Sequence, residues 1–263
     1  MKLKLIILIV LIIPFLVQVN AQSEVENKKQ RIKKNTTNNA LEKKDGENMA
    51  KINISAFILK GFGVQYERKI GQRTTLALGY SAIPTSTVAF KSFYDKQIDN
   101  ARVNIEDFKI GTSIFTPELK YYFGNKGAFH GFYLSTYVRI SHYNIEGPVK
   151  YNSSTNVERT AIFSGSINSI SGGLLLGSNF KIGKKLYLDW WIIGGSLGKA
   201  SGNVSANTPL NQDEQNGLKD ALNNTDIPLT SIQSEVNANG ATVTSKGSVV
   251  GLRGLGINFG IRF

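Results

Sequence analysis

The sequence predicts an all-β protein, an eight-stranded antiparallel up-and-down transmembrane β-barrel, on three observations. From Lys51 onward, apolar and polar residues alternate with the period of two that is typical of a strand with one apolar and one polar face. The alternating segments number eight, and an even number lets the first and last strands of an antiparallel meander pair. Apart from the short connection at 60–61, short glycine-containing turns lie at one end of the strands and long polar loops at the other, as in barrels of the bacterial outer membrane.

The strands follow from this pattern applied along the chain. The fifth strand is the clearest, because Phe132 and Ile140 share an apolar face while Tyr133 and Arg139 share a polar one. The expected strands cover residues 52–59, 62–70, 73–83, 109–123, 130–145, 162–182, 185–198 and 248–263. Short turns are expected at one end of the strands, at 71–72, 124–128 and 183–184, and long polar loops at the other, at 84–108, 146–161 and 199–247.

Three regions are expected along the chain. Residues 1–21 are typical of a cleavable secretory signal peptide, with Lys2 and Lys4 before the apolar run from Leu5 to Val17. At about 1.5 Å per residue that run is too short to cross a hydrocarbon layer of about 30 Å as a helix. Residues 22–50 are polar and charged and are predicted to be a flexible periplasmic linker, and residues 51–263 form the outer-membrane β-barrel domain.

The amino-acid composition limits the catalytic and metal-binding chemistry that the chain can perform. The chain has no cysteine and two histidines, His130 and His142, so thiolate chemistry is excluded and no metal or other cofactor is expected. The net charge is +12, but the basic residues are scattered and the chain is predicted to be exported. Nucleic acid is therefore not expected as a partner.

The polar faces of the strands are predicted to point inward. They carry tyrosine, glycine, serine and isolated charges rather than the dense lysine and glutamate coat of a soluble surface. A secreted sandwich or a lipocalin-like barrel with an apolar core is the alternative. The charges allow two interpretations, a polar path for solutes or a paired structural network, and we expect the network because eight strands leave little free lumen. Its predicted members are Glu67, Glu118, Lys120, Arg139, Lys181 and Asp189.

Three sequence features bear on activity and on binding. Ser141, His142 and Glu146 suggest a catalytic group, but neighbours on a strand point to opposite faces, so no catalytic centre is expected. His130 is expected to be an interfacial residue. The 199–247 loop is the first place to look for a binding function, with a short helix near 212–223 capped by Asn211 and a possible extension of the last strand from Val236 to Val243. The glycines of Ser171–Phe180 are expected to relieve crowding inside a tightly curved sheet.

Three stretches resemble a family of small Gram-negative outer-membrane β-barrel proteins whose domain has no known function. They are FGVQYERKIGQRTTLALGY (Phe62–Tyr80), TPELKYYFGNKGAFHGFYLSTYVRISHY (Thr116–Tyr143) and TVTSKGSVVGLRGLGINFGIRF (Thr242–Phe263). In general form the family is similar to OmpA/OmpX-type barrels. The resemblance implies fold and location and supplies no catalytic or ligand residues. The alternating C-terminal residues Phe259, Ile261 and Phe263 resemble the signal that the outer-membrane insertion machinery recognises.

The sequence therefore predicts an outer-membrane protein of a Gram-negative bacterium with a structural or surface-interaction role. Its expected partners are outer-membrane lipid and lipopolysaccharide, the barrel insertion machinery, and an extracellular or envelope protein that the sequence does not identify. A narrow channel for small or apolar solutes and a lipid-modifying barrel enzyme are the alternatives. The segment 22–50 is a further candidate for docking to another envelope component.

Overall fold

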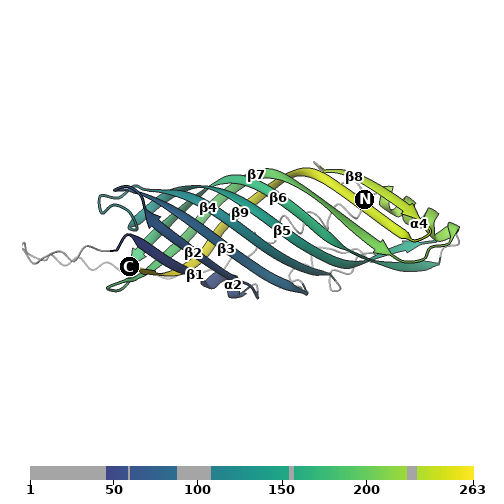
Figure 1. Ribbon diagram of the computed structural model, residues 1–263, viewed down its shortest axis with the longest axis horizontal. Coiled ribbons are helices and arrows are strands. Elements are labelled where there is room, and N and C mark those ends of the chain that lie inside the picture. Colours follow the sequence, from purple (N-terminus) through teal and green to yellow (C-terminus); the bar gives the residue numbers. More distant parts are fainter. Residues whose placement is uncertain (1–45, 59, 88–107, 154–156, 224–229) are drawn as a thin grey trace, which may run out of the picture.

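The computed structural model describes residues 46–58, 60–87, 108–153, 157–223 and 230–263. The predicted signal peptide, most of the predicted linker and most of the predicted 84–108 loop lie outside these residues. Nine strands and two helices follow one another, and long antiparallel strands dominate (Figure 1). They are β1 (Asn48–Asn53), α2 (Ile54–Ile58), β2 (Phe62–Lys69), β3 (Thr74–Thr87), β4 (Lys109–Tyr122), β5 (Gly131–Asn152), β6 (Glu158–Lys181), β7 (Leu186–Asn207), α4 (Gln212–Asn223), β8 (Thr230–Asn237) and β9 (Gly240–Arg262).

The strands form one antiparallel sheet that closes on itself. Its order is β1-β2-β3-β4-β5-β6-β7-β9-β8, and β1 also pairs with β9, from Met49 opposite Arg262 to Asn53 opposite Asn258. The first and last strands therefore complete a ring of hydrogen bonds. We call the end that holds Asn48 and Phe263 the base, and the opposite end, with α4, the hairpin end (Figure 1).

The ninth strand corrects the predicted count of eight. β9 pairs with β7 along one edge, whereas its other edge pairs with β8 up to Gly247 and with β1 from Asn258 onward. Eight strands make the ring and β8 adds to it only at the hairpin end. β8 falls within the predicted 199–247 loop and forms a tight hairpin with the start of β9. The last strand is therefore extended as expected, and β8 pairs with this extension.

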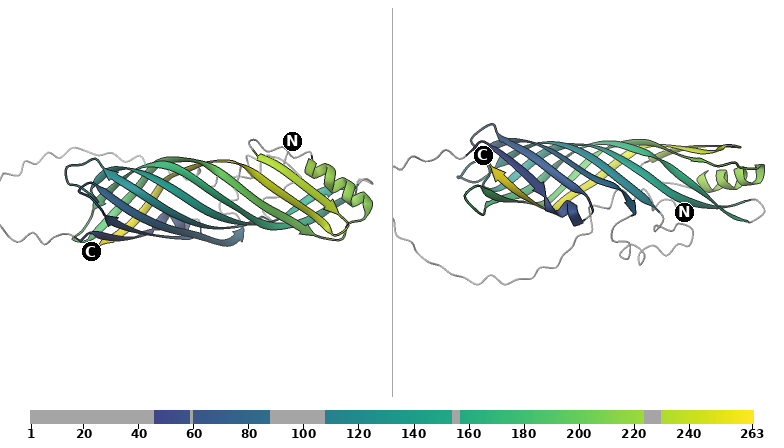
Figure 2. Two further views of the ribbon diagram at one scale, coloured as in Figure 1. Left: turned by 45° about the horizontal axis from the view of Figure 1, so that its top comes forward. Right: turned by 60° about the horizontal axis from the view of Figure 1, so that its bottom comes forward.

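Strands also extend into segments that were predicted to be loops. β5 and β6 stay paired out to Asn152 and Glu158, and β7 runs to Asn207. Figure 2 shows these strands projecting beyond β1, β2 and β3 toward α4. The prediction of loops was therefore wrong at 146–152, 158–161 and 199–207, because these polar and charged stretches lack the continuous apolar face that marks a strand in sequence.

The first predicted strand, 52–59, is also corrected. β1 begins at Asn48, inside the segment predicted to be a linker, and ends at Asn53. There the Asn53 side chain accepts a hydrogen bond from the Ala56 amide at 2.9 Å and starts the short helix α2. The Ser55 hydroxyl in turn accepts a hydrogen bond from the Ile257 amide at 2.9 Å. The helix therefore lies against the edge of β9 just above β1.

The two faces of the closed sheet differ in the direction that the alternation predicts. Along β5, Phe132, Leu134, Val138 and Ile140 are exposed on the outer face, while Tyr133 and its alternate neighbours are buried in the interior. The same holds for the other ring strands: large apolar side chains cover the outside, whereas the interior holds the charged and polar side chains together with buried aromatic rings. No helix among the described residues is both long enough and apolar enough to cross a membrane.

Candidate functional site

A buried ion network crosses the interior near the base. Lys51 donates to Glu67 and to Asp189, each at 2.5 Å, and thus connects β2 to β7. Lys120, on β4, lies 3.1 Å from Glu67 and 3.3 Å from Asp189. The side chains of Lys51, Glu67, Lys120 and Asp189 are at most 1% exposed. Two cations and two carboxylates from four strands therefore neutralise one another out of contact with water.

Neutral donors complete the shell around these carboxylates. Thr75 and Tyr122 donate to Glu67 at 2.6 and 2.7 Å. Tyr133 donates to the second oxygen of Asp189 at 2.7 Å. A buried carboxylate needs several such donors to offset the loss of water, and these two carboxylates have them.

A second layer lies one step toward the hairpin end and is centred on Glu118. Its carboxylate accepts hydrogen bonds from Gln65 and Ser135, both at 3.2 Å, and forms an ion pair with Arg253 of β9. Lys120 lies 3.9 Å away and links the two layers. We call these six residues the interior ion network: Lys51, Glu67, Glu118, Lys120, Asp189 and Arg253.

The structure brings together four of the six residues predicted for such a network, namely Glu67, Glu118, Lys120 and Asp189. Arg139 is also in the interior, within electrostatic range of Glu118 and Arg253, but it forms no ion pair with any described residue. Lys181 is exposed, and its ammonium lies over the Tyr187 ring at 5.9 Å. It lies outside the network because it is the last residue of β6, where the strand reaches solvent at the base.

The sequence reasoning missed Lys51 and Arg253. Both occupy inward positions of the alternation, which was the available signal. Lys51 was placed at the start of the barrel domain but outside the first predicted strand, which was expected to begin one residue later. Arg253 lies among glycines and small residues of β9 and was not singled out.

Interior aromatic rings lie across glycines of the neighbouring strand. A Cβ added to Gly177 would lie 2.4 Å from Cζ of Tyr133, and one added to Gly173 would lie 2.8 Å from Cζ of Tyr137. Likewise, a Cβ on Gly256 would lie 2.6 Å from the Trp191 ring. These glycines make room for the rings, which agrees with the role predicted for Gly173 and Gly177 in relieving crowding.

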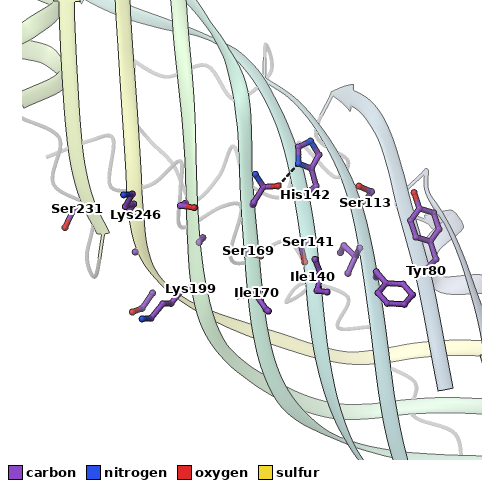
Figure 3. A pocket seen from close by; sticks show the side chains of 17 residues that line it. Tyr80, Ser113, Ile140, Ser141, His142, Ser169, Ile170, Lys199, Ser231 and Lys246 are labelled. Carbon is purple, nitrogen blue, oxygen red and sulfur yellow. Dashed lines mark hydrogen bonds between the residues drawn. The ribbon is translucent and has the colours of Figure 1, made fainter. Parts of the chain in front are cut away.

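Toward the hairpin end the interior is hollow. A cavity of about 870 Å³ lies at this level, and Figure 3 shows side chains that line it. β4, β5, β6, β7 and β9 each contribute three successive residues, and β3 and β8 contribute one each. The middle residues of the triplets are mostly small: Ile114, Ser141, Ser169, Ala200 and Gly247. Along the ring, the interior thus changes from a packed, charged region near the base to an open cavity lined mostly by small side chains.

The two histidines contact amide and carbonyl oxygens. The Nδ1 atom of His142 lies 2.8 Å from Asn168 Oδ1, and the dashed line at His142 in Figure 3 marks this contact. The neighbouring Ser141 is buried. His130 contacts the Ala128 carbonyl oxygen through Nδ1 at 3.1 Å and packs edge-on against Tyr187. The described residues contain no group of three or more His, Cys, Asp or Glu side chains that could hold a metal ion.

The hairpin end has its own apolar cluster around α4. The helix covers the predicted range, and Asn211 and Glu214 exchange hydrogen bonds of 2.9 and 3.0 Å between side chain and backbone, which is a capping box. Arg159 of β6 lies 3.2 Å from the Glu214 carboxylate. Burial, and then the charge of Glu214, raises the pKa of Tyr151 above its ordinary value. The cluster buries Tyr151, Ala161, Phe163, Ala206, Leu210, Leu218, Leu222 and Ala241.

Comparisons with known proteins place the chain in one family. No curated protein and no solved structure shows significant similarity to it. A family model described as "Protein of unknown function (DUF3575)" matches residues 7–225, which is most of the chain. The match includes the strands that supply Lys51, Glu67, Glu118, Lys120 and Asp189 to the interior ion network. The chain therefore belongs to the DUF3575 family of proteins of unknown function.

Proposed function

We propose that the protein is an eight-stranded outer-membrane β-barrel of a Gram-negative bacterium that acts at the cell surface through its hairpin end. One observation carries the proposal. The ring strands expose large apolar side chains on the outside and bury ion pairs on the inside, which is the reverse of a protein folded in water. A closed sheet also satisfies every ladder hydrogen bond, as hydrocarbon surroundings require.

The outward apolar side chains of the ring strands form a band around the sheet, which we call the apolar band, and this band ends at a similar point on several strands. On β5 the outward residues are apolar up to Ile140 and then change to His142, and on β6 Ile170 is followed toward the hairpin end by Asn168. On β7, Leu197 is followed by the exposed Lys199. A band that ends on several strands is what a membrane of fixed thickness selects. Outer-membrane lipid and lipopolysaccharide are accordingly the proposed surroundings.

The C-terminal residues fit recognition by the barrel insertion machinery. Phe259, Ile261 and Phe263 are about half-exposed on the outer face at the base. They are therefore available to an inserting factor and later to lipid. The export signal and the periplasmic linker remain parts of this proposal.

The proposed surface role is located at the hairpin end. Beyond the band, β5, β6, β7, β8 and β9 continue as a projecting sheet covered by α4 (Figure 2). A folded projection with its own apolar cluster is a rigid binding platform of the kind that surface proteins use. The packed ion network argues against a continuous channel, and the opposed Ser141 and His142 side chains argue against an enzyme.

Cell fractionation with a heat-modifiability gel tests the proposal. The protein is expected in the outer-membrane fraction, and the unboiled sample is expected to migrate differently from the boiled one because a closed sheet resists detergent unfolding. A soluble periplasmic protein without a boiling-dependent shift would overturn the proposal. The outward apolar residues would then form an interface with another chain.

A further inference from the structure

Basic side chains outnumber acidic ones in the interior of the ring above the base. Lys51, Lys120, Arg139 and Arg253 face only Glu67, Glu118 and Asp189 among the described residues. Lys51 and Lys120 account for Glu67 and Asp189, which leaves two arginines for one glutamate. The surplus positive charge is therefore located at Arg139 and Arg253, on the side of the network that faces the hairpin end.

Hydrogen-bond donors at the same place lack acceptors. Arg253 stacks between Tyr137 and Trp191, with its guanidinium carbon 4.8 and 4.1 Å from the two ring centres. Its Nη1 atom, the Tyr137 hydroxyl and the Trp191 ring nitrogen are buried without a hydrogen-bond partner among the described residues. An unpaired guanidinium N–H with two further unpaired donors beside it leaves three buried groups that an acceptor would satisfy.

The hollow part of the interior begins one to three residues beyond Arg139 on β5, where Ile140, Ser141 and His142 line the cavity. Arg139 is the inward residue two positions before Ser141 on β5, so their Cα atoms are about 7 Å apart, and Ser141 lines the 870 Å³ cavity. Arg139 is partly exposed, whereas the side chain of Arg253 is 9% exposed. A ligand at this end of the cavity therefore lies next to Arg139, which is itself within electrostatic range of Arg253.

We propose that Arg139 and Arg253, with Tyr137 and Trp191, bind the oxyanion group of a small acid or of an acidic lipid at the floor of this cavity. The proposal deepens the proposed function by naming a ligand class for the barrel interior and rests on that function only for the lipid source. The shared chemistry is a carboxylate or phosphate oxygen that accepts hydrogen bonds from guanidinium, phenol and indole groups.

An oxyanion is the ligand that these four residues select. Guanidinium groups offer paired N–H donors that match the oxygens of a carboxylate or phosphate, and the indole is a donor only. A neutral ligand would leave the second arginine uncompensated, and a cation would be repelled. The small walls of Ser141, Ser169 and Ala200 leave space for the remainder of the ligand.

Tryptophan fluorescence of the full mature chain measures this binding. The chain has two tryptophans, and the outward one is removed in Trp190→Phe, so that the emission reports on Trp191 beside Arg253. The protein is placed in phosphatidylcholine nanodiscs and titrated with sodium phosphate, sodium acetate and sodium chloride. A parallel sample in nanodiscs that contain phosphatidylglycerol provides the lipid arm.

Arg139→Gln is the test variant, because it removes a charge that forms no ion pair with any described residue and so leaves the network intact. We expect it to weaken binding at least about tenfold, the effect of losing one hydrogen bond between charged groups. Tyr137→Phe removes a single hydroxyl and is expected to weaken binding about threefold or more. Lys184→Gln removes the same charge from an exposed turn at the base and is expected to change nothing.

The outcomes distinguish a soluble acid from an acidic lipid as the ligand, and a failure of the binding site from a failure of the proposed barrel. A saturable emission change with phosphate or acetate, lost in Arg139→Gln, supports a soluble acid. A difference between the two nanodisc compositions that Arg139→Gln abolishes supports an acidic lipid. No response, a response equal in Arg139→Gln and its parent, or one that chloride reproduces would overturn the site. A heat-shift gel of the same samples checks folding, so a shift without binding refutes only the site, whereas no shift refutes the barrel.

Discussion

At the residue scale, the defining feature is a set of charges that compensate one another away from water. Lys120 contacts Glu67 and Asp189 and links them to the layer of Glu118. Each of these ions is stable in the interior only because its partners are fixed on other strands. The charges meet only when β1, β2, β4, β7 and β9 are all in register. The network therefore stabilises the closed sheet in this register.

Removing one cation of the network tests this coupling. Lys120→Met is expected to lower the free energy of unfolding by about 3–5 kcal/mol, because Glu67 and Asp189 would share the single cation Lys51. Urea unfolding in lipid vesicles gives the value. In the control, Lys109→Met removes half of the exposed pair with Glu146, which we expect to contribute at most about 1 kcal/mol. Equal effects of the two changes would show that the network adds no stability.

At the element scale, β6 shows how a strand is fitted to its neighbours. Gly173 faces inward, where a Cβ would lie 2.2 Å from the carbonyl oxygen of Gly195 and 2.8 Å from the Tyr137 ring. The adjacent Gly172 faces outward, and its nearest neighbour would lie 3.9 Å away. The two glycines are neighbours in the sequence, but only the inward position lacks room for a side chain.

Alanine at these two positions therefore makes a matched pair. Gly173→Ala is expected to cost about 1–3 kcal/mol through overpacking. Gly172→Ala is expected to be neutral or slightly stabilising, because glycine weakens the interior of a strand. Denaturant midpoints of the two variants provide the comparison, and a larger loss for Gly172→Ala would contradict the assignment of the two faces.

The helix α4 offers a second test at this scale. Asn211→Ala removes the side-chain half of the capping box and is expected to reduce the local stability of the helix by about 0.5–2 kcal/mol. Hydrogen exchange of the α4 amides measures this loss. Lys219→Ala changes an exposed position of the same helix and serves as the control. Protection that falls equally in both variants would mean that the cap does not anchor the helix.

At the scale of the whole molecule, the outer face decides between lipid and water. Leu174 is 53% exposed near the middle of the apolar band on β6, and Val157 is 47% exposed near the hairpin tip. In a protein surrounded by water, arginine at either position would change stability by about 0.5 kcal/mol or less. In a bilayer only the band position is costly.

On the proposed membrane location, Leu174→Arg is expected to destabilise the folded protein by about 2–4 kcal/mol and Val157→Arg by much less. Equilibrium unfolding from lipid vesicles measures both. Indistinguishable values would argue against a bilayer around the band.

The channel alternative is tested by single-channel recordings on the parent protein. They are expected to show no steady conductance, because the ion network fills the interior near the base. A stable open current would favour the channel alternative.

The local features of the fold followed from the sequence because they depend on short-range periodicity. Alternation assigned the outward Ile140 and the inward Tyr133 correctly, and the polar cap with an apolar stripe located α4. The polar strand β8 and the ends of β5, β6 and β7 were missed because small polar residues carry no such signal. The exclusion of Lys181 depended on where β6 ends, which alternation does not define within a residue or two.

Alternation in the sequence was enough to separate a polar from an apolar face on each predicted strand, and the composition excluded thiolate chemistry. Which inward residues meet depends on the three-dimensional fold. Lys51 and Asp189 are 138 residues apart, and they touch because the stagger of the strands and the pairing of β1 with β9 bring them to one level. That stagger is a property of the whole closed sheet, so the local pattern supplies candidate members of the ion network but not the pairs that they form.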